Sequence, residues 1–267
     1  MDRFGITTTV VSLGNPWLDP FSGEVAMELA RRLNEELASL ESETSGRVVG
    51  MGVLPQHDLA AAVDTARMIA ESDSLHGIVL GPRICGMQLD DPGLDPLWQV
   101  LQVTRTPALF HPHFSDCIEE FESFSDLYHV AIGFPMASTM AVARLVMAGV
   151  LERFREMSVV VSHGGGTIPF LAGRLDAVWQ LDAQAQERLH SPPSEQLSRL
   201  YLDTIVYHER SLRAAADLVG THRMVFGTDH PFSIAQPDTN LLAISEVFGV
   251  DERVAVLSTT AKRVFGL

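Results

Sequence analysis

Residues 226–232 read FGTDHPF, and this stretch decides the fold because it places a carboxylate directly after a strand. The run at residues 223–226 is apolar and β-branched enough to form a short buried strand. Pro231 ends it, since proline has no backbone N–H to donate. Asp229 therefore lies at the carboxyl end of the strand, where barrels of parallel strands collect their catalytic side chains. Read alone, this aspartate binds a metal, moves a proton or only caps the next helix.

Two histidines follow apolar runs in the same way. His111 comes after ALF, and His163 comes after SVVVS and before three glycines. The glycines let the backbone turn sharply and let a ligand approach closely. Each histidine alone could be a core or loop residue, and we expect His113 in a loop. Two imidazoles and a carboxylate at one barrel mouth, however, fit a divalent metal site with an acid/base partner.

Strand-like and helix-like segments alternate along the whole chain, which predicts a parallel sheet with helical crossovers. Candidate catalytic residues on early, middle and late strands favour a TIM-type (β/α)8 barrel over an open sheet. A closed barrel needs eight strands, and we find seven, so we expect an incomplete barrel whose first strand is missing. We expect residues 1–267 to form a single domain, because no Gly/Ser linker interrupts them. The predicted strands cover residues 6–13, 48–54, 77–80, 108–110, 158–162, 200–207 and 224–226, and the predicted helices cover residues 24–40, 59–70, 95–103, 138–154, 168–189, 211–218, 240–248 and 251–265.

Composition limits the partners of the protein. The formal net charge of −15 argues against nucleic acid or an anionic membrane as a partner. We find no signal peptide and no apolar run long enough to cross a bilayer. Cys85 and Cys117 are the only cysteines and lack CxxC spacing. Free thiols and a cytoplasmic location are therefore expected.

Several stretches resemble the decarboxylase branch of the amidohydrolase superfamily, which includes aminocarboxymuconate-semialdehyde and γ-resorcylate decarboxylases. The first three, which are most similar to fungal uracil-5-carboxylate (isoorotate) decarboxylase, are SLGNPW at 12–17, HPHF at 111–114 and GFPM at 133–136. The other two, SHGGGTIPF with GR at 162–174 and GTDHPF at 227–232, are specific to the branch. The resemblance covers essentially the whole chain. Members of the family begin with a His-x-His strand that this sequence lacks, so we expect the chain to be truncated at its N-terminus and to bind metal weakly.

The resemblance implies roles for individual residues. His111 and Asp229 would bind a divalent metal, with zinc expected and manganese as the alternative, and His163 would be the catalytic histidine beside it. Arg174 would bind the carboxylate of a small-molecule substrate, across the interface of a homodimer. Its alternative role is a salt bridge on a helix surface.

Asn15 and Phe232 match positions that hold the substrate ring by hydrogen bonding and by packing. Otherwise Asn15 only shapes a turn before Pro16, and Phe232 belongs to the core.

We expect the complete protein to catalyse non-oxidative decarboxylation of an aromatic, pyrimidine or enol-type carboxylate. Asp229 would be catalytic by delivering a proton to the carbon that loses CO₂, with His163 orienting the reacting group or activating a water molecule. One alternative is a metal-dependent hydrolase of a cyclic amide, lactone or ester. The other is a metal-free homologue with a binding or structural role.

Overall fold

The computed structural model describes residues 1–14, 17–18, 20–112 and 125–267. By its internal contacts, the chain divides into two compact units, which we describe separately. The first consists of Met1–Phe114 and Phe154–Ser158, and the second of Ser115–Arg153 and Val159–Leu267. A single domain over the whole chain stays a prediction.

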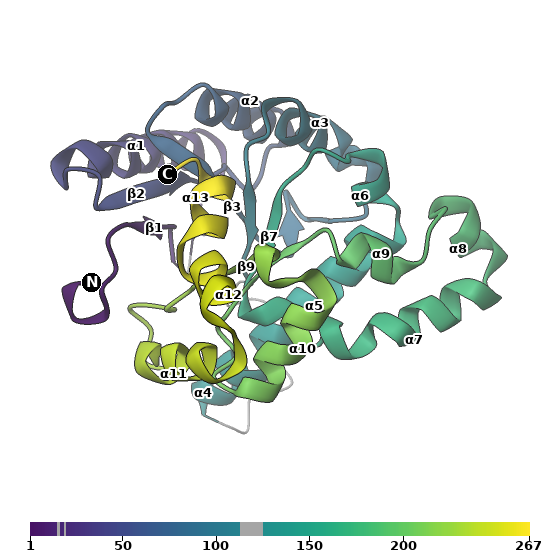
Figure 1. Cartoon of the computed structure of the whole chain (residues 1–267). Helices are drawn as coiled ribbons and strands as arrows, with labels where there is room; N and C mark the ends of the chain where they lie inside the picture. The colour runs from purple at the N-terminus through teal and green to yellow at the C-terminus, as the bar shows by residue number, and fades with distance from the viewer. Residues whose placement is uncertain (15–16, 19, 113–124) are drawn as a thin grey trace. The chain divides into compact units, whose positions relative to one another are not determined.

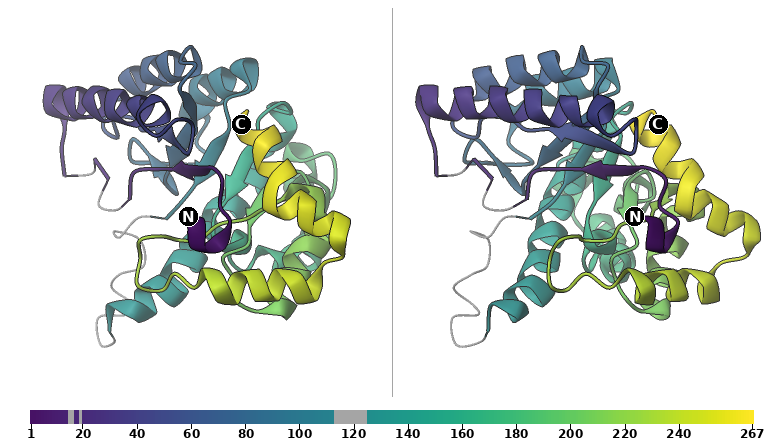
Figure 2. Two further views of the ribbon diagram at one scale, coloured as in Figure 1. Left: turned by 60° about the vertical axis from the view of Figure 1, so that its left-hand side comes forward. Right: turned by 90° about the vertical axis from the view of Figure 1, so that its left-hand side faces the viewer.

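Parallel strands form the centre of the first unit. They are β1 (Thr9–Val11), β2 (Val48–Gly52), β3 (Leu75–Leu80) and β6 (Ala108–Phe110), and each neighbouring pair is parallel. Three helices, α1 (Gly23–Glu43), α2 (Leu59–Ala70) and α3 (Asp95–Thr104), lie together over one face of these strands (Figures 1 and 2). Asp58 caps the N-terminus of α2, since its side chain accepts a hydrogen bond from the Ala61 N–H at 3.1 Å. The short elements are η1 (Asp2–Phe4), η2 (Pro92–Leu94) and the antiparallel pair β4 (Arg83–Ile84) and β5 (Met87–Gln88).

Close packing between helix and strand depends on glycine in this unit. A Cβ atom added to Gly50 of β2 would lie 2.5 Å from the Leu37 carbonyl oxygen of α1. The core beside it is apolar and fully buried, and each such side chain contributes about 1.5–3 kcal/mol relative to an exposed one. Among the largest fully buried residues are Trp98, Met51, Leu54, Ile69, Ile78, Leu80, Leu97 and Leu101.

The second unit repeats the same pattern with three parallel strands. They are β7 (Val159–Val161), β8 (Tyr201–Asp203) and β9 (Met224–Val225), with Val161 opposite Leu202 and Asp203 opposite Val225. The helical elements before and between them are α4 (Asp126–Tyr128), the π-helix η4 (His129–Gly133), α5 (Phe134–Met147), α6 (Val150–Arg153), η5 (His163–Gly165), α7 (Ile168–Leu181), α8 (Ala183–Arg188), α9 (Pro193–Leu197), α10 (Glu209–Val219) and η6 (Thr221–Arg223). The chain ends with α11 (Pro237–Val247), α12 (Val250–Val254), the π-helix η7 (Ala255–Thr259) and α13 (Thr260–Phe265), drawn in yellow-green to yellow in Figure 1.

The strands follow the order β1-β2-β3-β6-β7-β8-β9 in one seven-stranded sheet. The α/β class and the seven predicted strands are therefore confirmed. Five of the observed strands are shorter than predicted, β6 has the predicted bounds, β3 begins two residues earlier than predicted, and the β4–β5 pair was not predicted.

Three predicted helices were wrong in their boundaries. The helix predicted at 138–154 begins earlier, at Phe134, and ends at Met147, shortly before Gly149 with a φ of 69°. The helix predicted at 168–189 is divided into α7 and α8 because the Asp182 side chain caps the second of them. The last predicted helix is divided into α12, η7 and α13.

We expected no apolar run long enough to cross a bilayer, and this expectation was wrong. Helical residues His129–Met147 are long and apolar enough to cross a membrane by length and composition alone. The sequence analysis placed the start of this helix after Pro135. In the structure, η4 runs directly into α5 across Pro135, so the two elements form one longer helical segment. Half of the segment is buried inside the structure, and a core helix of a soluble protein passes the same test, so it is weak evidence for a membrane.

Candidate active site

Asp229 follows β9, as the sequence predicted. Its backbone has a φ of 57°, a left-handed conformation that aspartate adopts more readily than most residues. The side chain is half-buried, and burial raises the pKa of the carboxyl group. No described residue donates a hydrogen bond to this carboxylate or forms an ion pair with it. A shielded carboxylate without a neighbouring cation is typical of a metal-binding or proton-transfer position.

The loop that carries Asp229 is fastened by a buried amide. Asn240 of α11 donates from Nδ2 to the Gly227 carbonyl and to the Thr204 hydroxyl, both at 2.9 Å. The Gly227 N–H donates to the same hydroxyl at 3.3 Å. The segment that follows β9 is thereby tied to the segment that follows β8.

His163 begins the η5 turn directly after β7. Its φ of 57° is left-handed, and the three glycines that follow also have positive φ values. The Asp203 carboxylate accepts hydrogen bonds from the backbone N–H groups of His163 at 3.0 Å and of Gly164 at 2.8 Å. Among the neighbours of the imidazole, the Ser162 hydroxyl lies 3.3 Å from its Nδ1 atom, and the Phe134 ring stacks on it at 6.4 Å between centroids.

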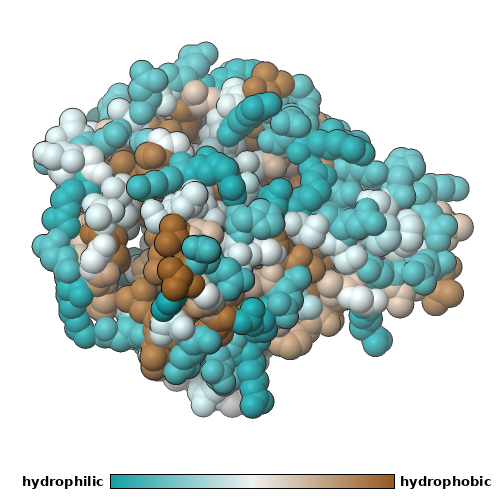
Figure 3. All heavy atoms as spheres, in the orientation of Figure 1, coloured by the Kyte–Doolittle hydropathy of each residue, from teal (hydrophilic) through white to brown (hydrophobic). Residues whose placement is uncertain are grey.

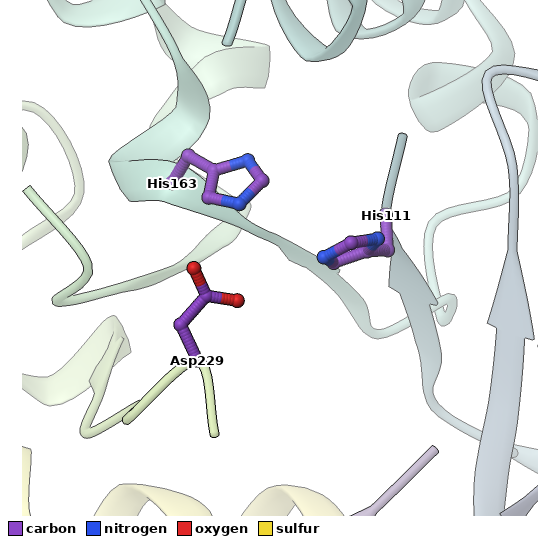
Figure 4. A group of neighbouring side chains, drawn as sticks. All are labelled: His111, His163 and Asp229. Atoms are coloured by element: carbon purple, nitrogen blue, oxygen red, sulfur yellow. The ribbon is translucent and has the colours of Figure 1, made fainter. Parts of the chain in front are cut away.

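The structure brings His163 and Asp229 together. A ring nitrogen of His163 and a carboxylate oxygen of Asp229 lie within 4.8 Å of one another, and Figure 4 shows the two side chains pointing toward each other. His111 follows β6 in the first unit, and its predicted place beside them in a metal site stays a prediction. The Nδ1 atom of His111 lies 3.0 Å from the Pro112 carbonyl oxygen. A proton on Nδ1 would make this hydrogen bond and leave the Nε2 lone pair for a metal.

The other predicted site residues have different outcomes. Asn15 and His113 lie outside the described residues. Phe232 is half-buried, and its backbone N–H donates to the Asp229 carbonyl at 3.0 Å, so it shapes the same loop. Arg174 is exposed on α7 and makes no hydrogen bond or ion pair with the residues that the structure describes. The predicted substrate-binding roles therefore stay predictions.

Two residues near the site were missed by sequence reasoning. Asp203 is buried at the end of β8, and burial raises its pKa to about 7 while three backbone N–H groups act to lower it. Tyr207, a few residues later, has a φ of 52°. Its hydroxyl group is buried and makes no hydrogen bond of ordinary distance and angle, although the Gln236 backbone lies near enough to act to lower its pKa. Burial and then the charge of Asp229 raise its pKa to about 12. Both residues had been read as part of an ordinary strand.

Parallel strands whose carboxyl ends carry histidine and aspartate are typical of metal-dependent α/β-barrel enzymes. The model of the amidohydrolase family matches residues 3–267 of the chain. The chain belongs to the amidohydrolase family, in its decarboxylase branch.

Three similar proteins illustrate this relationship. The 2-amino-3-carboxymuconate-6-semialdehyde decarboxylase of Dictyostelium discoideum is 25% identical over 232 residues, which are 86% of this chain and 63% of that protein. The crystal structure of apo IDCase from Metarhizium anisopliae is 32% identical with a TM-score of 0.92, over 100% of this chain and 76% of that one. Dihydroxybenzoic acid decarboxylase from Polaromonas sp., solved with manganese and 2-nitroresorcinol, shares the fold at 19% identity and a TM-score of 0.85. The match covers 100% of this chain and 84% of that one. The TIM-barrel-like α/β fold is thereby confirmed.

Proposed function

We propose that this protein is a metal-dependent, non-oxidative decarboxylase of aromatic, pyrimidine or enol-type carboxylates. The observation that carries the proposal is the pair of His163 and Asp229, an imidazole facing an uncompensated carboxylate within 4.8 Å. Relatives in the same family are named as decarboxylases, which supports the choice of reaction. Since the chain spans 63% of the length of the Dictyostelium relative, the activity of the whole protein is part of the proposal.

The donor set fits a divalent metal. Two imidazole nitrogens and a carboxylate oxygen suit zinc or manganese, and a half-buried carboxylate without a cation beside it gains most from such an ion. His111, His163 and Asp229 would hold the metal. When bound, it would fix the substrate oxygen atoms and withdraw electron density from the carboxylate-bearing carbon. The sequence favoured zinc, and the Polaromonas structure contains manganese, so both metals belong in the test.

Residues of the chain would then supply the proton that replaces CO₂. When the bond to CO₂ breaks, its electron pair stays on the ring or enol carbon, which must take up a proton. Asp229 would hold that proton on a carboxyl oxygen and deliver it to the carbon. His163 would keep the reacting group in register, and the stacked Phe134 ring restricts the motion of the imidazole.

The exposed surface around Arg174 supports the proposal that two copies of the chain associate. Phe170, Arg174, Val178 and Leu181 follow one another at helical spacing along α7 and form one exposed stripe, which we call the α7 stripe. Phe170, Val178 and Leu181 are 70%, 52% and 89% exposed. Figure 3 shows hydrophobic atoms over the outer end of α7. Exposed apolar groups of this kind mark interaction surfaces. We therefore include a homodimer in the proposal, with Arg174 offered to the substrate carboxylate of the partner subunit.

An activity assay whose products differ between a decarboxylase and a hydrolase tests the proposal. The protein is loaded with Zn²⁺ or Mn²⁺ and incubated with 2,6-dihydroxybenzoate, uracil-5-carboxylate, a lactone and a cyclic amide. Release of CO₂ from a carboxylate, lost in Asp229→Asn and kept in Asp217→Asn, supports the proposal. Asp217 is a suitable control because it is an exposed aspartate of the same unit. Ring opening of the lactone or amide without CO₂ would assign a hydrolase, and binding without turnover of any of the four compounds would contradict the proposed decarboxylase and favour the binding role.

A further inference from the structure

Asp203 is a buried carboxylate to which the proposed reaction assigns no role. The side chain is 6% exposed at the end of β8. Its Oδ2 atom accepts from the His163 N–H at 3.0 Å, and its Oδ1 atom accepts from the Gly164 and Ile205 N–H groups at 2.8 and 3.0 Å. No lysine or arginine forms an ion pair with Asp203 within the described part of the chain. Backbone dipoles alone therefore compensate this buried carboxylate.

The hydrogen bonds fall on a backbone that needs support. His163 has a φ of 57° and Gly164 a φ of 60°, so two successive residues are left-handed. Glycine adopts this conformation freely, whereas a histidine does so only when its surroundings impose it. Successive backbone N–H groups in such a turn converge on an anion. Here the anion is the side chain of Asp203.

The same contact determines where the imidazole points. His163 is attached to the backbone that Asp203 holds, and its ring is directed toward Asp229 (Figure 4). Two of the contacts of the ring are those with the Ser162 hydroxyl at 3.3 Å and with the Phe134 ring at 6.4 Å. Neither of these contacts fixes the backbone. The His163 carbonyl also accepts from the Gly166 N–H at 2.9 Å, so the Asp203 contact holds the N–H side of this residue. We expect a release of the His163 N–H to change the direction of the ring.

We propose that Asp203 is a positioning residue, whose carboxylate fixes the left-handed backbone of His163 and thereby holds the imidazole against Asp229. The inference rests on the proposed function for its effect on catalysis, but the backbone clamp itself does not depend on any reaction. Displacement of a reacting group by about 1 Å costs on the order of 100-fold in rate, so a loosened His163 should lower kcat more than substrate affinity.

The variant Asp203→Asn is expected to remove one of the three hydrogen bonds and keep the other two. The amide oxygen can replace Oδ1 and still accept from Gly164 and Ile205. The amide NH₂ group then faces the His163 N–H, and two donors cannot bond to each other. The substitution should therefore release His163 and leave the other two contacts in place. Asp182→Asn is the matched control, since the Asp182 side chain also accepts from two backbone N–H groups but caps α8.

Two measurements on the metal-loaded protein test the clamp. We expect the His163 amide to exchange its hydrogen slowly in the wild type and about 100-fold faster in Asp203→Asn, with Gly164 and Ile205 still protected. We expect kcat to fall by about 100-fold with KM changed by less than about threefold, while Asp182→Asn keeps both values.

Contrary results would separate this inference from the proposed function. Fast exchange of the His163 amide in the wild type would overturn the clamp without any variant, so a misfolded Asp203→Asn protein does not block the test. Unchanged exchange and kcat in Asp203→Asn would also overturn it. Absence of CO₂ release by the wild type would instead overturn the proposed function, and the exchange result would still decide the role of Asp203.

Discussion

The Asn240 amide donates to the Gly227 carbonyl oxygen at 2.9 Å, two residues before Asp229. The same nitrogen donates to the Thr204 hydroxyl, so one buried side chain links the segments that follow β8 and β9. Asn240→Ala would leave a buried carbonyl oxygen without its donor. We expect a loss of about 2–4 kcal/mol in the free energy of unfolding, measured by urea denaturation. The half-buried neighbour Thr239 bonds only to the Gln236 side chain at the surface, so Thr239→Ala should change it by less than about 0.5 kcal/mol. Equal stability of the two variants would contradict this role of Asn240.

Gly166 is the third glycine after His163, and its position requires glycine. Its φ is 64°, and an added Cβ atom would lie 2.2 Å from the Pro135 carbonyl oxygen. Gly166→Ala should therefore destabilise the protein by more than about 1–2 kcal/mol, since both the backbone and the space oppose it. Gly173→Ala is the matched control, because Gly173 lies within helix α7 with nothing within 4 Å of the added atom. We expect that control to raise the thermal midpoint by the equivalent of about 0.5–1 kcal/mol. Both variants moving the midpoint in the same direction would refute the argument.

Tyr207 should be tolerant of losing its hydroxyl group. The hydroxyl is buried and makes no hydrogen bond of ordinary distance and angle, with only the Gln236 backbone near it, so Tyr207→Phe removes a largely desolvated polar group. We expect the thermal midpoint to stay the same or to rise, by the equivalent of up to about 1 kcal/mol. A fall equivalent to more than about 1 kcal/mol, measured by calorimetry, would mean that the hydroxyl group is bonded within the protein.

The α7 stripe predicts self-association. Leu181→Glu places a charge at its most exposed apolar position, and Leu242→Glu places the same charge on exposed α11. We expect the first variant to elute as a monomer in size-exclusion chromatography with light scattering, and the second to elute like the wild type as a dimer. A monomeric wild type, or a dimer that survives Leu181→Glu, would remove α7 as the interface.

The sequence predicted what depends on local patterns. Short apolar runs ending before His111, His163 and Asp229 predicted both the strands and the polar ends that follow them. Hydrophobic periodicity predicted the helices, because a helix buries one stripe of side chains. Helix ends were predicted less well, since the cap made by Asp182 divides a pattern that is otherwise continuous.

The supporting residues could not be predicted, because their roles depend on contacts between distant parts of the chain. Asp203 and His163 are 40 positions apart in sequence, and Asn240 is 36 from Thr204. The predicted strand at 200–207 also ends early for a physical reason. Asp203 accepts a hydrogen bond from the Ile205 N–H two residues ahead at 3.0 Å, and this local bond replaces the strand ladder.

The central claim is that Asp229 with His163 and His111 binds a divalent metal, and a Mn²⁺ titration tests it most directly. Free Mn²⁺ is followed by electron paramagnetic resonance in the wild type, Asp229→Asn, His111→Asn and the surface control Asp217→Asn. We predict saturable binding to the wild type and the control, weakened by about 10-fold or more in the other two variants. Because the comparison is relative, it holds even if the wild type binds weakly. No saturable binding by the wild type, or equal affinity in Asp229→Asn, would contradict the account.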